Sequence, residues 1–324
     1  MPVCQIEEYA DSQQARAELI PWLVATDTEQ LNAETWQKRL SHWWDENTFA
    51  AKVSLRGWIL RYDGNIVGFM GLIPTCYNVC GHPTPAFIAS TWRVDENHRN
   101  ASISMLVKLR NLAKTTLIAD TTPTPQVRAL LERSGWISLP DIQRRFVPLG
   151  IFQKLTMRKR WPTLPPRKRV TRDPGDVQCI AASCMSSTSI EKCITPDYLR
   201  WFASSPKRRH EFVGVMDDSG CLSSYLFLTS KNVRGIPAWM EIDHFTTATS
   251  CDELHALVGE IVRRPSLLGN ERLLSLAAFP GDFSWEGTPA LHQRTEHVPH
   301  FFAIPEALKQ IPKRTVLAEG DWGL

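Results

Sequence analysis

Residues 85–114 constrain the fold more than any other part of the chain. The stretch up to Val94 is typical of a buried strand, the polar residues 95–102 of a tight turn, and residues 103–114 of an amphipathic helix. A helix that begins directly after a strand directs its unpaired N–H groups at whatever lies beyond the strand. Arg99 adds a positive charge at that point. The segment therefore predicts a phosphate-binding site in an α/β protein.

The rest of the first half places this segment in a recognisable order of elements. Helical spacing of apolar residues predicts two helices first, at residues 12–25 and 33–46. The turn signal Asp63-Gly64-Asn65 then joins two strands. In full, we expect strands at residues 56–62, 66–74, 85–94, 116–120 and 142–149, with helices at residues 103–114 and 124–134. This order mixes an antiparallel hairpin with a strand–helix–strand crossover, and it predicts an α/β fold with helices layered on a mixed, mostly antiparallel sheet.

A similar order returns later in the chain, which suggests two domains. At 324 residues the chain is long enough for two domains of about 150 residues each. The repeated elements are a helix at residues 195–204, strands at 211–216, 222–230 and 238–246, a helix at 251–263 and a strand at 272–278. We therefore expect a first domain at residues 1–152 and a second, degenerate copy at residues 176–324.

The segment between the two expected domains is basic and rich in proline. Residues 154–172 contain eight Lys or Arg, three Pro and no acidic residue, which predicts a stiffened linker at residues 153–175. The alternative is a basic patch for an anionic partner. Because no nucleic-acid motif or stacking aromatic residues accompany the charges, we consider nucleic acid an unlikely partner.

Composition narrows the cellular setting. No apolar run approaches the roughly 20 residues of a membrane span, and Glu7, Glu8 and Asp11 stand where a signal peptide needs positive charge. The eight cysteines are scattered, and Cys76 and Cys80 alone come close to a pair. We therefore expect a cytoplasmic protein with free, buried thiols, no membrane span and no metal site.

The first half resembles the Gcn5-related N-acetyltransferase (GNAT) superfamily, whose members bind acyl-coenzyme A. The resemblance is carried by the hairpin at residues 63–65, the strand ending at Val94-Asp95-Glu96, the turn at residues 99–104 and the segment 130–136, which ends in Gly-Trp. In that superfamily the turn usually reads Arg or Gln, two residues, Gly, one residue, then Gly or Ala. Arg99 matches this pattern, whereas Ser102 and Ser104 replace both small residues.

The resemblance implies a cofactor and a set of site residues. Acetyl-coenzyme A or another acyl-coenzyme A would be bound through its pyrophosphate by the turn, and the expected cofactor-binding residues are Trp92, Arg93, Val94, Arg99, Asn100, Ala101, Ser102, Ile103, Ser104 and Thr122. A base in this superfamily is often a carboxylate near the end of the central strand, which makes Glu96 and Asp95 the catalytic candidates. Both could instead be solvated charges at a helix start. Leu131 stands where the superfamily commonly has a tyrosine as the acid.

The second half lacks the features that predict cofactor binding. Its corresponding turn, residues 246–253, has no Arg or Gly and ends in Asp252 and Glu253, which would repel phosphate. Glu241, Asp243 and His244 lie on one strand, and the period of two puts Glu241 and Asp243 on the same face. These residues are candidates for recognising an amine or sugar acceptor, or they are charges on a half-solvated strand.

Three functions remain in competition. The first is an acyl-coenzyme A-dependent acyltransferase, foremost an N-acetyltransferase, acting on an amine or sugar. The second is a non-catalytic tandem scaffold. The third is a FemAB-like aminoacyl transferase, since two-domain chains that end in an acidic segment such as Glu319-Gly320-Asp321 are similar to acyltransferases of exopolysaccharide gene clusters and, more distantly, to FemAB-type enzymes. The acyl group, the acceptor and the oligomeric state stay open.

Overall fold

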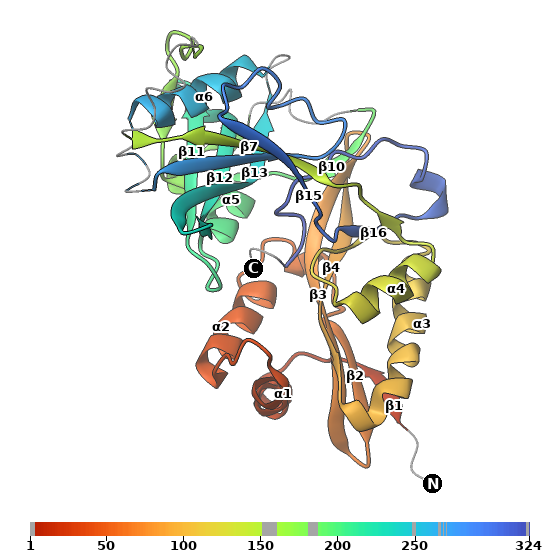
Figure 1. The fold of residues 1–324 in the computed structure, drawn as a ribbon. Helices are drawn as coiled ribbons and strands as arrows, with labels where there is room; N and C mark the ends of the chain where they lie inside the picture. The colour runs from red at the N-terminus through yellow and green to blue at the C-terminus, as the bar shows by residue number, and fades with distance from the viewer. Residues whose placement is uncertain are drawn as a thin grey trace.

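The chain folds into two mixed, mostly antiparallel sheets with helices on their faces (Figure 1). The computed structural model describes residues 4–150, 161–180, 187–247, 251–264, 267, 269, 271–321 and 324. Within these residues each sheet has eight strands. The predicted layered α/β fold is confirmed.

The first sheet is built around one long hairpin. Its strands follow the spatial order β1 (Gln5–Glu8), β2 (Gly57–Tyr62), β3 (Asn65–Val79), β4 (His82–Val94), β5 (Ile118–Asp120), β16 (Phe301–Ala303) and β6 (Ile137–Ser138), with β10 (Ile190–Lys192) against β3. β4 and β5 run parallel, and the other pairs are antiparallel. β3 and β4 are longer than predicted, because Cys80 and Gly81 form a two-residue turn with φ angles of 51° and 91°.

Helices cover both faces of the first sheet (Figure 1). α1 (Gln13–Thr26) and α2 (Ala33–Trp44) lie on one face, and α3 (Ser102–Leu112) and α4 (Pro125–Arg133) lie on the other. Three of these helices begin at residues with good capping side chains, because Ser12, Asn32 and Thr124 each accept the backbone N–H three residues further on. The two faces bury separate apolar clusters, one around α1 and α2 and one around α3 and α4.

The second sheet repeats this arrangement. Its strands follow the order β15 (His292–Glu296), β7 (Ile142–Pro148), β14 (Leu273–Ala278), β13 (Ile236–Thr246), β12 (Cys221–Val233), β11 (His210–Met216) and β8 (Arg169–Thr171), with β9 (Cys179–Ile180) against β12. β13 and β14 run parallel, as β4 and β5 do. α6 (Asp252–Arg263) packs on one face, and α5 (Pro196–Ala203) packs on the other.

The two halves exchange strands and share a core. β7 pairs with β14 and β15, so the prediction that residues 142–149 complete the first sheet is wrong. Conversely, β16 comes from the far end of the chain and pairs with β5 and β6. An alternating pattern of apolar residues predicts a strand but does not state which edge the strand joins. α2 also meets α5, where the Trp201 indole donates to the His42 carbonyl at 2.8 Å.

Part of the predicted linker belongs to the second sheet. Residues 153–160 lie outside the described residues. After them, Trp161 is 9% exposed and packs in the apolar cluster under α6. A Cβ at Gly259 would lie 2.8 Å from the Trp161 Cβ, so the helix can approach this indole because it has glycine there. Lys168 donates to the Ser223 hydroxyl at 2.9 Å, and β8 then pairs with β11.

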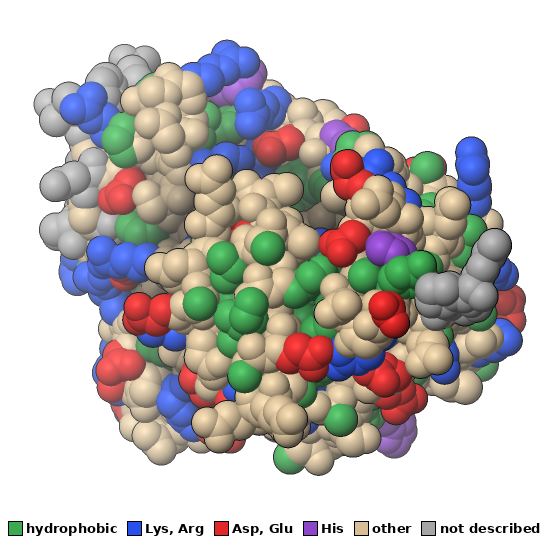
Figure 2. All heavy atoms as spheres, turned by 90° about the horizontal axis from the view of Figure 1, so that it is seen from below, with side chains coloured by type: hydrophobic (Ala, Val, Ile, Leu, Met, Phe, Trp, Pro, Cys, Tyr) green, Lys and Arg blue, Asp and Glu red, His purple; other side chains and the backbone are tan. Residues whose placement is uncertain are grey.

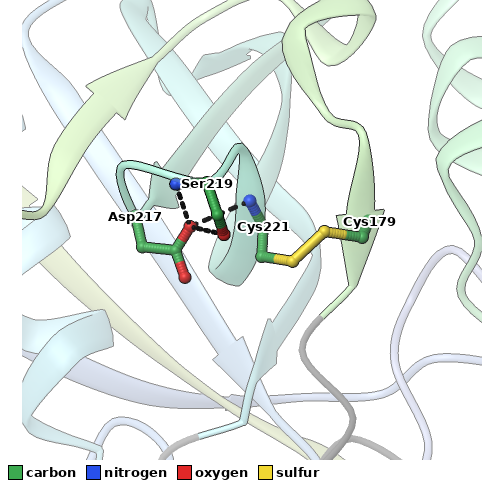
Figure 3. The surroundings of a disulfide bond; sticks show 4 residues. All are labelled: Cys179, Asp217, Ser219 and Cys221. Atoms are coloured by element: carbon green, nitrogen blue, oxygen red, sulfur yellow. Dashed lines mark hydrogen bonds between the residues drawn. A yellow bond between two sulfur atoms is a disulfide. The ribbon is translucent and has the colours of Figure 1, made fainter.

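A disulfide joins Cys179 and Cys221 in the second half (Figure 3). The two residues are partners in the short parallel pair of β9 and β12, with their Cα atoms 4.6 Å apart. Asp217 shapes the preceding turn by accepting the N–H groups of Ser219 at 2.9 Å and Cys221 at 3.0 Å. The prediction of free thiols is therefore wrong for this pair. These two cysteines no longer support the predicted cytoplasmic location.

Charges on the outer surface are mixed. Figure 2 shows a face on which acidic and basic side chains are interspersed with small groups of hydrophobic ones. Among the helices that the structure describes, none is long and apolar enough to cross a membrane.

Candidate functional site

A cavity of about 960 Å³ lies where β4 and β5 separate. The two strands pair at Phe87 with Ile118 and at Ile88 with Ala119, and their described pairing ends there. Beyond that point the cavity is lined by residues 90–96 of β4 and its C-terminal end, and by Asp120 and residues 122–124 after β5. This volume is in the range of small-molecule binding sites. The parallel pair thus opens into a wedge between its carboxyl ends.

A bulge in β4 forms one wall of the wedge. Gly71 pairs with Ser90 and Phe69 pairs with Arg93, so Thr91 and Trp92 together face Met70 alone. Thr91 has a φ of 54°, a strained conformation for a β-branched residue. A bulge leaves backbone N–H and C=O groups without partners in the ladder. It therefore supplies donors for a ligand in the middle of the sheet.

On the face of the sheet that α3 and α4 cover, the start of α3 borders one end of the cavity. Arg99 and Ser102 line it, and Arg99 bonds to Glu96 at 2.7 Å with both side chains largely exposed. The predicted tight turn is a 3₁₀ helix, η2 (Glu96–Ala101), in which the Ser102 N–H donates to the Arg99 carbonyl. The four other predicted residues of this turn adjoin the cavity without lining it: Asn100, Ala101, Ile103 and Ser104.

The cavity also reaches the opposite face of the sheet. There it is lined by the loop between α1 and α2, by Arg39 of α2 and by two residues of the second half, Lys207 and Arg208. On the α3/α4 face, Gln126, Val127 and Leu130 of α4 complete the lining. One cavity therefore joins both faces of the first sheet, an arrangement that lets two molecules meet from opposite sides.

Two carboxylates meet at the centre of the wedge. Asp120 ends β5 and is 6% exposed, and Asp321 arrives from the far end of the chain. Burial, and next the charge of Asp321, raise the pKa of Asp120 to about 8. Asp321 accepts the hydroxyl groups of Ser90 and Thr122, each at 2.6 Å.

The path of the chain before Asp321 depends on glycine. A Cβ at Gly320, where φ is 152°, would lie 1.7 Å from the Thr121 hydroxyl oxygen. Sequence reasoning missed both carboxylates as site residues. The acidic end of the strand at residues 116–120 was a signal for Asp120, whereas nothing local indicated where Asp321 lies.

The residues predicted on the central strand line the cavity but differ in their side-chain partners. Trp92, Val94 and Thr122, which were predicted to contact a cofactor, line the cavity, and so do the catalytic candidates Asp95 and Glu96. Asp95 accepts the Trp22 indole N–H at 3.2 Å, which ties it to α1. The Glu96 side chain is 85% exposed and bonds to Arg99.

Arg93 uses its side chain away from the wedge. Its guanidinium bonds to the buried Asp27 carboxylate at 2.9 Å and lies 5.5 Å from the Trp36 ring centre. Arg93 therefore holds the connection between α1 and α2, while its position in β4 still borders the cavity.

The residues predicted for acceptor recognition in the second half are buried away from this cavity. Glu241 and Asp243 do not share a face, so that prediction is wrong. Leu228 pairs with Glu241 and Phe227 with Asp243, which leaves Ile242 as the extra residue of a bulge, and one extra residue reverses the alternation. Asp243 bonds to Lys192 at 2.6 Å and to the Tyr225 hydroxyl at 3.0 Å.

Side chains fill the corresponding wedge of the second half. Glu241 accepts the backbone N–H of Ala277 on β14 at 2.7 Å, and the Trp285 indole donates to the Ala277 carbonyl at 3.0 Å. His244 lies between Glu241 at 3.0 Å and Asp282 at 2.9 Å. Burial alone would lower the pKa of His244, but the two carboxylates outweigh it and raise this pKa to about 9. These groups form a buried charge network that closes the gap.

The residues that the structure describes contain no group of three or more His, Cys, Asp and Glu side chains placed to hold a metal ion.

Comparison with known proteins identifies the fold. The chain matches no protein-family model and no curated protein. It is similar in structure to a conserved protein of unknown function from Enterococcus faecalis V583, described as a probable N-acyltransferase, with a TM-score of 0.62, 13% identity, and coverage of 93% of this chain and 72% of that one. A GCN5-related N-acetyltransferase from Anabaena variabilis ATCC 29413 gives a TM-score of 0.61 at 9% identity, covering 92% and 72% of the two chains.

A third structure extends the same result. A GCN5-related N-acetyltransferase from Kribbella flavida matches with a TM-score of 0.58 at 10% identity, covering 93% of this chain and 71% of that one. At such identities the similarity shows the fold and not the activity. The chain thus has the tandem GNAT fold, with two related sheets in one polypeptide.

Proposed function

We propose that this protein is an acyl-coenzyme A-dependent acyltransferase, foremost an N-acetyltransferase, with its active site in the first wedge. The observation that carries the proposal is the cavity between β4 and β5, which is open to both faces of the sheet and bordered by a bulge. A cofactor can enter from the α3/α4 face while an acceptor approaches from the α1/α2 face. The fold found in N-acetyltransferases supports this reading.

The lining residues fit a coenzyme A thioester. Arg99 and the start of α3 would hold the pyrophosphate, since a positive charge and helix-start N–H groups both favour phosphate. The extended residues 92–94 would contact the pantetheine arm, and Thr122 would face it from β5. When bound, the cofactor supplies an acyl group activated as a thioester. The unpaired backbone groups of the bulge suit the oxyanion that develops on the thioester oxygen.

A base is needed to take the proton from the acceptor amine. With acyl-coenzyme A bound, the acceptor nitrogen would take the acyl group from the thioester sulfur, and the base would hold the proton that the amine gives up. Of the carboxylates that line the cavity, Asp120 combines burial with a pKa of about 8, which suits a base near neutral pH. Asp95 and Glu96 are the other candidates. Leu131 is fully buried in the core, so the thiolate receives its proton from another group.

The scaffold alternative makes a different structural prediction. A tandem fold kept for binding or assembly alone has no need to leave either wedge open. Here one wedge is filled by a charge network and the other is a cavity. The difference favours an enzyme with one active site.

Calorimetry with acetyl-coenzyme A tests the proposal. We expect the wild type to bind it, and Arg99→Glu to weaken binding at least about tenfold, because a charge-assisted contact to phosphate becomes a repulsion. Lys108→Glu, on the same helix but outside the cavity lining, is the matched charge reversal and should bind like the wild type. Absence of binding by the wild type would overturn the function, and equal binding by both variants would overturn the role of Arg99.

A further inference from the structure

The cavity wall on the α1/α2 face contains a buried arginine whose guanidinium has few hydrogen-bond partners. Arg39 is 4% exposed, and its guanidinium lies between the rings of Trp36 and Trp43, 4.7 and 4.9 Å from their centres. Among the described residues its guanidinium makes one hydrogen bond, to the main-chain oxygen of Leu324 at 3.4 Å, and its Nε has no partner. A buried guanidinium is normally paired with an anion, because desolvating an unpaired charge is costly.

A second cation borders the same end of the cavity. Lys207 lies in the loop between α5 and β11 and donates to the main-chain oxygen of Asp321 at 3.3 Å. Burial lowers the pKa of both Lys207 and Arg39, and the charge of Asp321 opposes this shift only in part. The second half thus contributes a charge to the cavity of the first.

Among the described residues no acidic side chain makes an ion pair with either cation, although the charges of Asp321 and Glu29 offset part of the cost of burying them. Both oxygens of Asp321 already accept hydroxyl groups, and Asp27 is used by Arg93. Glu29 lines the cavity and is exposed to solvent. Arg93, a neighbouring cation, has a buried carboxylate partner, whereas Arg39 and Lys207 have main-chain oxygens. Two cations that lack a direct bond to an acidic side chain among the described residues therefore line this cavity.

We propose that Arg39 and Lys207 bind an anionic group of the acceptor, a carboxylate or a phosphate, and so make the substrate an amine that carries a negative charge of its own. This inference rests on the proposed acyl transfer at the same cavity. The two tryptophans hold the guanidinium in one orientation, which lowers the entropy lost when it binds an anion. With its anion held there, the acceptor presents its amine to the bulge of β4 and to Asp120.

Matched acceptors test the inference. Thiol release from acetyl-coenzyme A is followed with two pairs: free amino acids against their amides, and glucosamine 6-phosphate against glucosamine. We expect the charged member of at least one pair to be turned over with a kcat/KM at least about tenfold higher. A preference within the first pair identifies a carboxylate acceptor, and one within the second pair identifies a phosphate acceptor.

Two variants connect the preference to these residues. Arg39→Gln and Lys207→Met should each raise the KM of the charged acceptor at least about tenfold more than the KM of its neutral counterpart. Lys309→Met, at an exposed position outside the cavity lining, is the control. Because Arg39 packs in the core, thermal unfolding is measured for every variant to check that it folds. If Arg39→Gln does not fold, the result for Lys207→Met tests the inference alone.

The possible results separate this inference from the proposed function. If the wild type does not bind acetyl-coenzyme A in calorimetry, both are overturned. If it binds the cofactor and acetylates neutral or cationic amines as well as anionic ones, the acyl transfer stands and the anionic acceptor is wrong. An unchanged KM in Lys207→Met, with the charge preference intact, likewise overturns the assignment of these residues.

Discussion

The two parallel strand pairs of this molecule show one backbone plan with opposite outcomes. β4 and β5 separate beside a bulge at Thr91, and β13 and β14 separate beside a bulge at Ile242. In the first pair the gap is a cavity of about 960 Å³. In the second, the Glu241 carboxylate reaches across to the backbone of Ala277. The fold therefore creates a wedge twice, and side chains decide whether it is available to a ligand.

The helices that follow the two bulged strands also differ, in the charge of the residues at their starts. α3 begins beside Arg99 and Ser102, which face the cavity. α6 begins with Asp252 and Glu253, and the buried Glu253 carboxylate accepts the Ser224 hydroxyl at 2.6 Å and lies 3.6 Å from Lys168. The positive charge at the start of α3 favours a phosphate ligand. At the start of α6, a buried acid occupies the corresponding position and bonds to other residues of the protein.

The largest expected effect comes from breaking the network that closes the second wedge. Asp282→Asn leaves the His244 charge with one partner fewer and should lower the free energy of unfolding by about 3–5 kcal/mol. Chemical denaturation measures this loss, with the exposed turn residue Asp218→Asn as control. Acetyl-coenzyme A binding should persist in conditions where the variant is folded. A variant as stable as the wild type would contradict the structural role of the network.

The same network predicts a pH dependence of stability. The pKa of His244 is raised to about 9 in the folded state, above its ordinary value near 6.5. Its contribution is therefore fully present below about pH 6.5 and is lost as the pH rises through 9. Thermal unfolding between pH 6 and 10 should show this decline in the wild type and a shallower one in Asp282→Asn. Parallel curves would show that His244 does not carry the effect.

Next in size is the loss of the base from the first wedge. Asp120→Asn should lower kcat by about 10²–10⁴-fold, because the amine then loses its proton to water. A base must be ionised to act, so wild-type kcat/KM should rise with pH through about 8, and this limb should be absent in the variant. Asp95→Asn and Glu96→Gln are the competing variants. If either removes the limb while Asp120→Asn keeps it, the base lies just after β4 and is not the last residue of β5.

The smallest of these effects comes from filling the first wedge as the second is filled. Thr122 is exposed and lines the cavity, so Thr122→Trp places an indole in the open space and also removes the hydroxyl that Asp321 accepts. Acetyl-coenzyme A should then bind about a hundredfold more weakly in calorimetry. Thr115→Trp, exposed at the end of the helix outside the lining, should bind normally. Unimpaired binding by Thr122→Trp would place the cofactor elsewhere.

Sequence reasoning located most elements of the wedge but not all of its chemistry. The strand to Val94, the helix after it and Arg99 between them were identified from residues that are neighbours in the chain. Asp321 was not identified, because it lies far from Asp120 in the sequence and comes near it only in the folded chain. The prediction that Glu241 and Asp243 share a face of their strand was wrong because of one residue. Ile242 is the extra residue of a bulge, so the side chains after it lie on the faces opposite to those that simple alternation predicts.

By itself the sequence determined what depends on short-range chemistry: the caps at Ser12, Asn32 and Thr124, the hairpin at Asp63-Gly64, and the repeated order of elements. The tertiary structure alone decided which sheet β7 and β16 join, that Cys179 meets Cys221, and which wedge stays open. The physical reason is the range of the interactions. Caps and turns act within a few residues, whereas an edge strand, a disulfide or a buried carboxylate takes its partner from whatever packing brings within reach.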